Sequence, residues 1–101
     1  MKMETITLHT KYPKKMVIPT MHQVFDRENA LILVQIERLK KEIKHFEDKY
    51  NMASEDFYKN FEEGKIGDTQ DFFMWASSID IHKRLKDKHT LLEEFTRQCK
   101  I

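Results

Sequence analysis

Glycine, proline and cysteine are scarce in this sequence. Its 101 residues include 2 glycines, 2 prolines and 1 cysteine, whereas 35% of the residues are charged. A β-rich fold needs more turn residues than this, and a disulfide-stabilised domain needs paired cysteines. The composition is typical of long helices with solvent-facing charged sides. A chain of this length is expected to form one domain.

An excess of one charge sign and long apolar runs are also absent. The 18 basic and 17 acidic residues leave a net charge of +1, so no global field draws the chain onto nucleic acid or an anionic membrane. No apolar run approaches the roughly 18 residues that cross a bilayer, and the N-terminus lacks the apolar core of a signal peptide. The lone Cys99 cannot form an internal disulfide. We therefore expect a cytoplasmic protein that binds no membrane.

Catalytic and metal-binding patterns are missing as well. Glu42 and His45 match half of a di-iron helix motif, but that site needs a second copy and facing glutamates. His82 and His89 share a helix face without a third ligand at a suitable spacing. There is no glycine-rich phosphate loop. We expect no enzyme activity, no metal and no cofactor.

Residues 1–19 differ in pattern from the rest of the chain. Polar and apolar residues alternate from Thr5 to Thr10, and Pro13 and Pro19 follow. Proline cannot donate to a strand ladder and favours extended backbone before it, so the segment is predicted to be an extended arm. A lone strand is unstable. The arm would have to lie on a second copy, on a partner's sheet edge or on the helices.

Residues 20–101 are predicted to form a helical hairpin. A first helix would begin at Thr20, where Gln23 completes a capping box, and would end near Tyr50. A short helix over residues 55–63 would begin at the cap Ser54 and close at Gly64, and a third helix would begin at the cap Asp68 and continue to the C-terminus. The predicted fold class is all-α, with two long antiparallel helices joined by a short one and an arm at the N-terminus.

Apolar residues recur at alternating spacings of four and three along both long helices, which predicts that the two helices pack together. Aromatic residues gather where the third helix begins, at Phe72, Phe73 and Trp75. An antiparallel return would place them against the end of the first helix and against the short helix. The residues they would meet there are Phe46, Tyr50, Phe57 and Phe61.

The segment from Ala30 to Ile36 is apolar around the whole helix, so one neighbouring helix cannot cover it. The arm, the short helix, a second copy or another protein would have to cover the rest. We predict a partner-binding surface at Leu31, Leu33 and Val34. Asn29 lies on the apolar stripe, where a polar residue can set register by pairing with its equivalent in another copy. The other residues predicted to bind a partner are the aromatics Phe72, Phe73 and Trp75.

Two basic clusters raise the alternative of nucleic-acid binding. Lys11, Lys14 and Lys15 form the first cluster, which could contact phosphates. The second cluster, over residues 38–44, is interleaved with acidic residues, and no helix-turn-helix is apparent. A solvated charged face is the favoured interpretation of both clusters.

Several motifs along the chain resemble a group of small archaeal and cyanobacterial proteins. These proteins combine a short arm ending in Val-Pro or Ile-Pro, a long helix ending in an aromatic-rich turn, and a Gly-Asp segment followed by Asp-Phe-Phe-x-Trp. The corresponding residues here are Ile18-Pro19, Lys49 to Ser54, Phe57, Phe61, Gly64, Gly67-Asp68, Asp71 to Trp75 and Arg84 to Lys86. The match covers roughly residues 17–95.

Members of this group look like antitoxins encoded beside a small toxin, which is expected to be a ribonuclease. The resemblance implies a non-catalytic protein that neutralises a cognate toxin by covering its active cleft. In this chain Thr69, Gln70 and Met74 make the Gly-Asp segment less acidic than is usual in the group, so steric occlusion is a better expectation than mimicry of RNA. The alternatives are a homodimeric helical bundle and, less favoured, a DNA-binding operon regulator.

Overall fold

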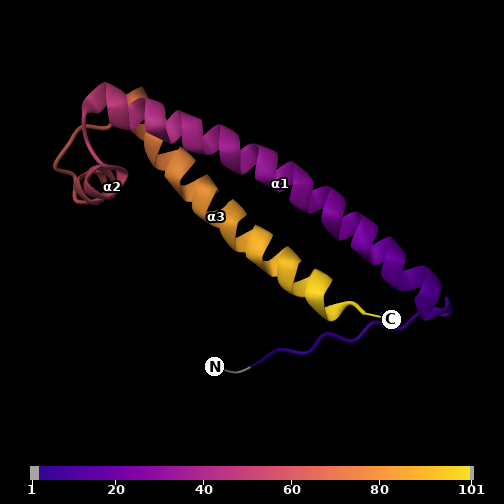
Figure 1. The fold of residues 1–101 in the computed structure, drawn as a ribbon. Coiled ribbons are helices and arrows are strands. Elements are labelled where there is room, and N and C mark those ends of the chain that lie inside the picture. Colours follow the sequence, from indigo (N-terminus) through magenta and orange to yellow (C-terminus); the bar gives the residue numbers. More distant parts are fainter. Residues whose placement is uncertain (1–2, 101) are drawn as a thin grey trace.

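The computed structural model describes residues 3–100, and these form a helical hairpin (Figure 1). The three helices are α1 (Lys14–Tyr50), α2 (Ser54–Glu62) and α3 (Gln70–Gln98), and the described residues include no strand. The long helices α1 and α3 run antiparallel, and α2 packs beside the start of α3. The predicted all-α hairpin is confirmed. Its long axis extends 57 Å, and its other dimensions are 29 and 18 Å.

The start of α1 differs from the prediction. The helix begins at Lys14 rather than Thr20, so Pro19 lies inside it and the extended arm ends at Pro13. The Pro13 carbonyl accepts hydrogen bonds from the amides of Met16 and Val17, at 3.0 and 3.1 Å. The Thr20 hydroxyl donates to the Met16 carbonyl at 2.8 Å instead of capping a helix.

Helix boundaries at the corner lie close to their predicted positions. The α1 helix ends at Tyr50 and is followed by Asn51, whose φ of 49° is left-handed, and Gly64 after α2 has a φ of 70°. Such angles favour glycine or asparagine, which explains these two residues. Thr69, rather than Asp68, caps α3, and its hydroxyl accepts from the Phe72 amide at 3.3 Å.

Two apolar clusters hold the hairpin together. Ile32, Ile36 and Leu92 form one cluster at mid-length between α1 and α3. The second cluster lies at the corner, where the Phe57 and Trp75 rings stack with centroids 3.8 Å apart. Phe46 of α1 also stacks with Trp75, with ring centroids 5.9 Å apart, so the predicted meeting of aromatics is confirmed.

Candidate functional site

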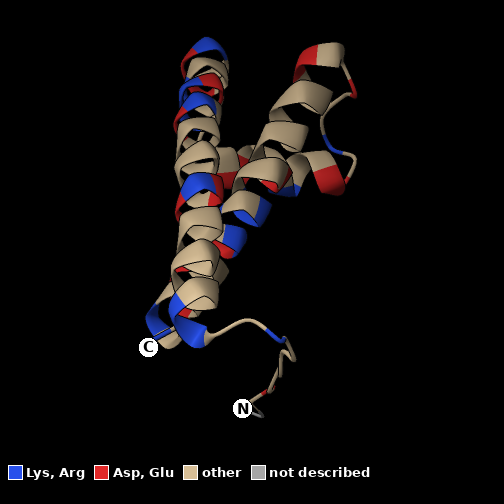
Figure 2. Ribbon diagram, turned by 90° about the vertical axis from the view of Figure 1, so that its right-hand side faces the viewer, with Lys and Arg blue, Asp and Glu red and all other residues tan. Residues whose placement is uncertain are grey.

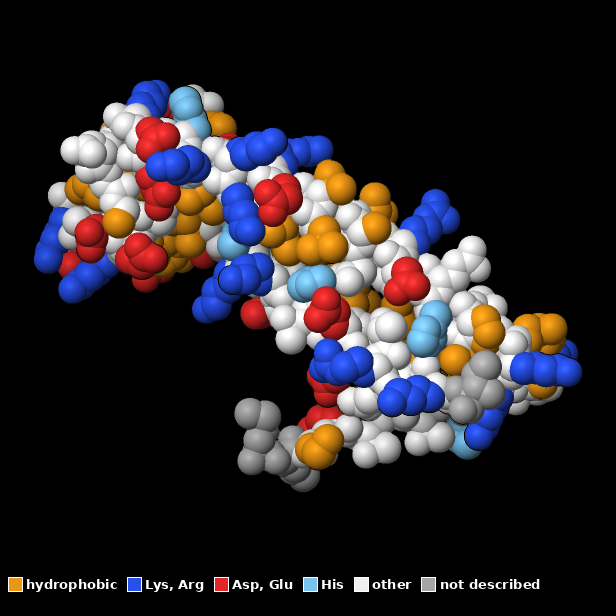
Figure 3. Space-filling model, viewed as in Figure 1, with side chains coloured by type: hydrophobic (Ala, Val, Ile, Leu, Met, Phe, Trp, Pro, Cys, Tyr) orange, Lys and Arg blue, Asp and Glu red, His pale blue; other side chains and the backbone are white. Residues whose placement is uncertain are grey.

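The apolar residues predicted to bind a partner are exposed on α1. Leu31, Leu33 and Val34 have 54, 45 and 60% of their surface in contact with water, whereas their neighbour Ile32 retains 2%. Neither the arm nor α2 covers them. The arm stands clear of the hairpin, and α2 lies at the corner, beside the start of α3 (Figures 1 and 2). Apolar side chains interrupt the charged surface along the middle of the hairpin (Figure 3). We call Leu31, Leu33 and Val34 the apolar patch.

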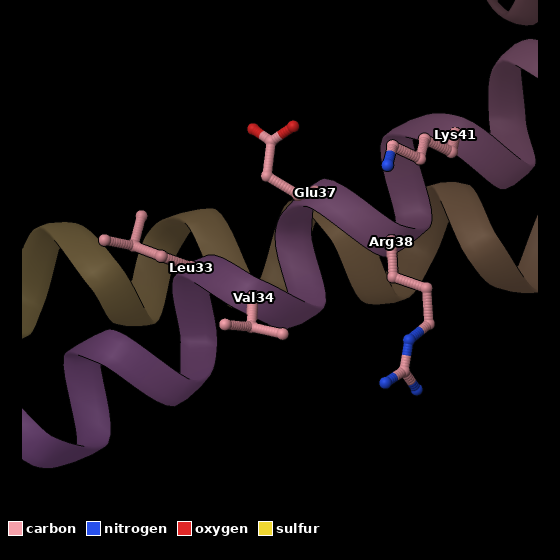
Figure 4. Close-up of a pocket in the computed structure, with 5 residues that line it drawn as sticks. All are labelled: Leu33, Val34, Glu37, Arg38 and Lys41. Atoms are coloured by element: carbon pink, nitrogen blue, oxygen red, sulfur yellow. The ribbon is translucent and has the colours of Figure 1, made fainter.

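A shallow hollow lies over this patch. Leu33, Val34, Glu37, Arg38 and Lys41 line it, and all five side chains project from α1 alone (Figure 4). Glu37 and Arg38 point to opposite sides of the helix. Because no residue of α3 contributes, the hollow is open to solvent and suits a protein surface better than a small molecule.

Basic residues border the patch along the outer side of α1. Arg27, Leu31, Val34 and Arg38 follow spacings of four, three and four, so they form one stripe on the helix. Neither arginine takes part in an ion pair among the described residues. The nearest acidic residue of the hollow, Glu37, contacts Lys40 at 3.4 Å. The patch therefore lies between two arginines that form no ion pair among the described residues.

The structure places Asn29 between the two long helices. Its Oδ1 atom lies 2.5 Å from Nδ1 of His89, whose Nε2 atom lies 3.2 Å from Glu93. The predicted pairing of Asn29 with its equivalent in another copy is therefore replaced by a contact within the chain. A polar pair of this kind favours one register of α1 against α3, since any slip would separate the two side chains.

The aromatic residues predicted to bind a partner separate into core and surface. Trp75 has no exposed surface, and its indole N–H donates to the Ser54 hydroxyl at 3.0 Å, so its assignment to a binding surface is wrong. Phe72 is half-buried against the corner cluster. Only Phe73 is exposed, with its ring edge-on to Phe61. It lies near the corner, about 20 Å along the hairpin from the apolar patch.

Lys11, Lys14 and Lys15 are exposed at the end of the hairpin opposite the corner (Figure 2). Lys14 and Lys15 belong to the first turn of α1, which contains no acidic residue, and Lys11 lies over the Tyr12 ring at 5.7 Å. Acidic and basic residues alternate along the two rods away from this end (Figure 2). The lysines therefore form a local cluster and are not part of a continuous basic groove.

Two tyrosine–carboxylate pairs at the corner were not predicted. The Tyr50 hydroxyl donates to Asp71 at 2.6 Å, and Lys49 also contacts Asp71, at 2.7 Å. Hydrogen bonds from Lys49 and Tyr50 lower the pKa of the Asp71 carboxyl. The second pair joins Tyr58 of α2 to Asp80 of α3, and this hydrogen bond raises the pKa of the tyrosine to about 12.

These pairs tie helices together at the corner. Asp71 is held ionised by its donors, and neither pair lines the hollow on α1. Within residues 3–100, no cluster of three or more histidine, cysteine, aspartate or glutamate side chains is arranged to hold a metal ion. Among the same residues, no helix has the length and apolar content that crossing a membrane requires.

Comparisons with protein-family models, with curated proteins and with solved structures found no match to this chain. The resemblance to antitoxins therefore stays a prediction. The exposed apolar patch between two arginines is the feature on which a function can be argued.

Proposed function

We propose that this chain is a non-catalytic, antitoxin-like protein that binds a small toxin encoded beside it and blocks the toxin's active cleft. The single observation that supports the proposal is the apolar patch, exposed in the middle of a long, regular helix. Burying the exposed portions of Leu31, Leu33 and Val34 would contribute roughly 3 kcal/mol to binding. An unpartnered hydrophobic surface of this kind marks a protein-interaction site.

The charges beside the patch favour a different protein over a second copy as its occupant. A two-fold axis that places Leu31 of one copy on Val34 of another also places Arg27 on Arg38, because both pairs are symmetric about the same point of the helix. Like charges facing each other disfavour that pairing. The partner's complementary surface would be apolar with carboxylates at its border.

The proposed mechanism is steric. The long rod would lie across the cleft with its apolar patch as the central contact and Arg27 and Arg38 as the polar rim. Because the patch is on the surface of the free chain, binding requires no opening of the hairpin. The partner is thereby held inactive for as long as the complex lasts.

Co-expression with the protein encoded by the neighbouring reading frame tests the proposal. The wild-type chain should relieve growth arrest caused by that protein and should co-purify with it. The double variant Leu31→Glu, Val34→Glu should fail in both assays while keeping its helical circular dichroism, because both side chains are exposed in the free chain. Leu91→Glu is the matched control, since Leu91 is similarly exposed on α3. Growth arrest that persists with the wild-type chain would contradict the proposal.

A helical bundle formed by two copies is a second candidate, and a different surface favours it. Met74 and Ile81 are exposed on α3 and are seven residues apart, which is the spacing of a coiled-coil seam. Two hairpins that packed along this seam would form a four-helix bundle and leave the apolar patch free. Light scattering coupled to size exclusion should show a dimer that Ile81→Glu converts to a monomer. A monomeric wild type would remove this candidate.

A further inference from the structure

The N-terminal arm has backbone groups without partners. Residues 3–12 are all exposed and adopt no helix, and the arm stands clear of the hairpin in two perpendicular views (Figures 1 and 2). Within the described chain, the one hydrogen bond made by a backbone group of residues 3–12 is donated by the Tyr12 amide to the Thr10 hydroxyl. Because these backbone groups face water and not the rest of the protein, they are available to pair with another strand.

The side chains of the arm have the pattern of a strand with one apolar face. In an extended segment Ile6 and Leu8 lie on one side, and Thr5, Thr7 and His9 lie on the other. Ile6 and Leu8 are 77 and 65% exposed. β-Branched residues such as threonine and isoleucine favour the strand conformation. The arm thus has the residue pattern of a strand, and the described residues contain no sheet with which it could pair.

We propose that residues 4–10 add as an edge strand to an open sheet edge of the partner protein, with Ile6 and Leu8 toward the covered face of that sheet. This inference rests on the proposed function, because it concerns the same partner. It adds a structural requirement: the partner contains a β-sheet with an unpaired edge strand. In strand addition the backbone ladder supplies affinity, and alternate side chains supply specificity.

A second copy of this chain does not supply such an edge. The described residues contain no strand, so two copies could pair only their arms. A two-stranded ribbon is marginally stable by itself. The helices of the same chain also cannot satisfy the arm, because their own backbone groups are already paired internally. A partner that brings its own sheet remains as the occupant.

Hydrogen exchange followed by NMR tests the inference residue by residue. The full-length chain, labelled with nitrogen-15, is measured alone and in complex with the protein of the neighbouring reading frame. In an added strand, successive amides point to opposite sides, so every second amide of residues 4–10 should be protected at least about tenfold in the complex. The amides between them should exchange nearly as fast as in the free chain.

Proline substitutions give an independent readout of the same alternation. Ile6→Pro and Thr7→Pro remove the amide protons of adjacent residues, and in an added strand only one of these protons points to the partner. Measured against the control variant at the same position, one proline variant should therefore bind roughly tenfold more weakly, and the other should bind within about threefold. Ile6→Thr and Thr7→Val serve as controls because they change the side chains and keep both amides.

The outcomes separate this inference from the proposed function. A complex that depends on Leu31 and Val34 but leaves all arm amides unprotected would overturn the strand addition alone. If the arm amides show alternating protection but Leu31→Glu, Val34→Glu leaves the affinity of the complex unchanged, the result would support the strand addition and contradict the role of the apolar patch. Protection that appears in the free chain and grows with its concentration would identify a second copy as the occupant and overturn the inference. The absence of any complex would overturn both.

Discussion

His82 of α3 carries a buried nitrogen that has no hydrogen-bond partner within the described residues. The Nε2 atom of its ring is inaccessible to water. Burial, followed by the charges of Lys86 and Lys40, lowers the pKa of His82 below its ordinary value of 6.5. A buried polar atom without a partner destabilises the folded state by about 1–3 kcal/mol. Replacing His82 with an apolar residue of similar size should therefore stabilise the hairpin.

Leucine at position 82 should raise the free energy of unfolding by about 1–2 kcal/mol, because it removes the unpaired nitrogen and places an apolar side chain at this half-buried position. For a chain of this size, each kcal/mol corresponds to about 4–8 °C in the thermal midpoint. The effect should depend on pH. The unfolded chain takes up a proton on this ring near pH 6.5, whereas the folded chain resists it. The free energy of unfolding of the wild type is therefore not reduced by protonation of His82 above pH 6.5, and it falls as the pH drops from 6.5 toward the pKa of His82 in the folded chain.

Thermal unfolding followed by circular dichroism measures both effects. The midpoint of His82→Leu should exceed that of the wild type at about pH 7, and the difference should grow at about pH 5. His9→Leu is the control, because it is the same substitution at an exposed histidine of the arm, outside the helices. A lower midpoint for His82→Leu, or a difference that stays constant with pH, would refute the reasoning.

Three further predictions concern the helices and the corner. Pro19→Ala should raise the free energy of unfolding by about 1–3 kcal/mol in urea titrations, because it restores an amide donor inside α1. Phe57→Ala should lower it by about 3–5 kcal/mol in the same assay, since Phe57 has no exposed surface and stacks on Trp75. Asp80→Asn should move the ultraviolet titration of Tyr58 down from about pH 12 toward 10, because the carboxylate that holds the phenol proton is removed. An unchanged free energy of unfolding for either of the first two variants, or an unchanged titration of Tyr58 for the third, would contradict the corresponding prediction.

The long helices were predictable because their apolar spacing is regular over many turns. Ile32, Ile36 and Phe46 lie on the predicted stripe of α1, and all three are buried. The start of α1 was misjudged because the extended backbone favoured before a proline is a preference and not a strict rule. The helix continues through Pro19, and the Thr20 hydroxyl donates to the Met16 carbonyl one turn earlier.

The contacts that tie the corner together were not predictable from spacing. The pairing of Tyr50 with Asp71 and that of Trp75 with Ser54 both join residues 21 positions apart across the corner. Their distances depend on the backbone angles of the connecting segments, which the sequence indicates only at Asn51 and Gly64. Asn29 was recognised as a polar residue in an apolar stripe, but its partner His89 could be found only once the register of the hairpin was known.

The balance of apolar surface connects the fold to the proposed function. Among residues 3–100, seven apolar residues form the buried core, while thirteen large apolar residues remain exposed. A hairpin of two long rods has too little interior for them, because only one side of each rod faces the other. A partner that covers the patch on α1 and pairs with the arm would bury part of this surplus and stabilise the folded chain, by about 2.7 kcal/mol when its concentration is 100 times its dissociation constant. The apolar side chains that the hairpin leaves exposed are therefore the ones from which the proposed complex would draw its affinity.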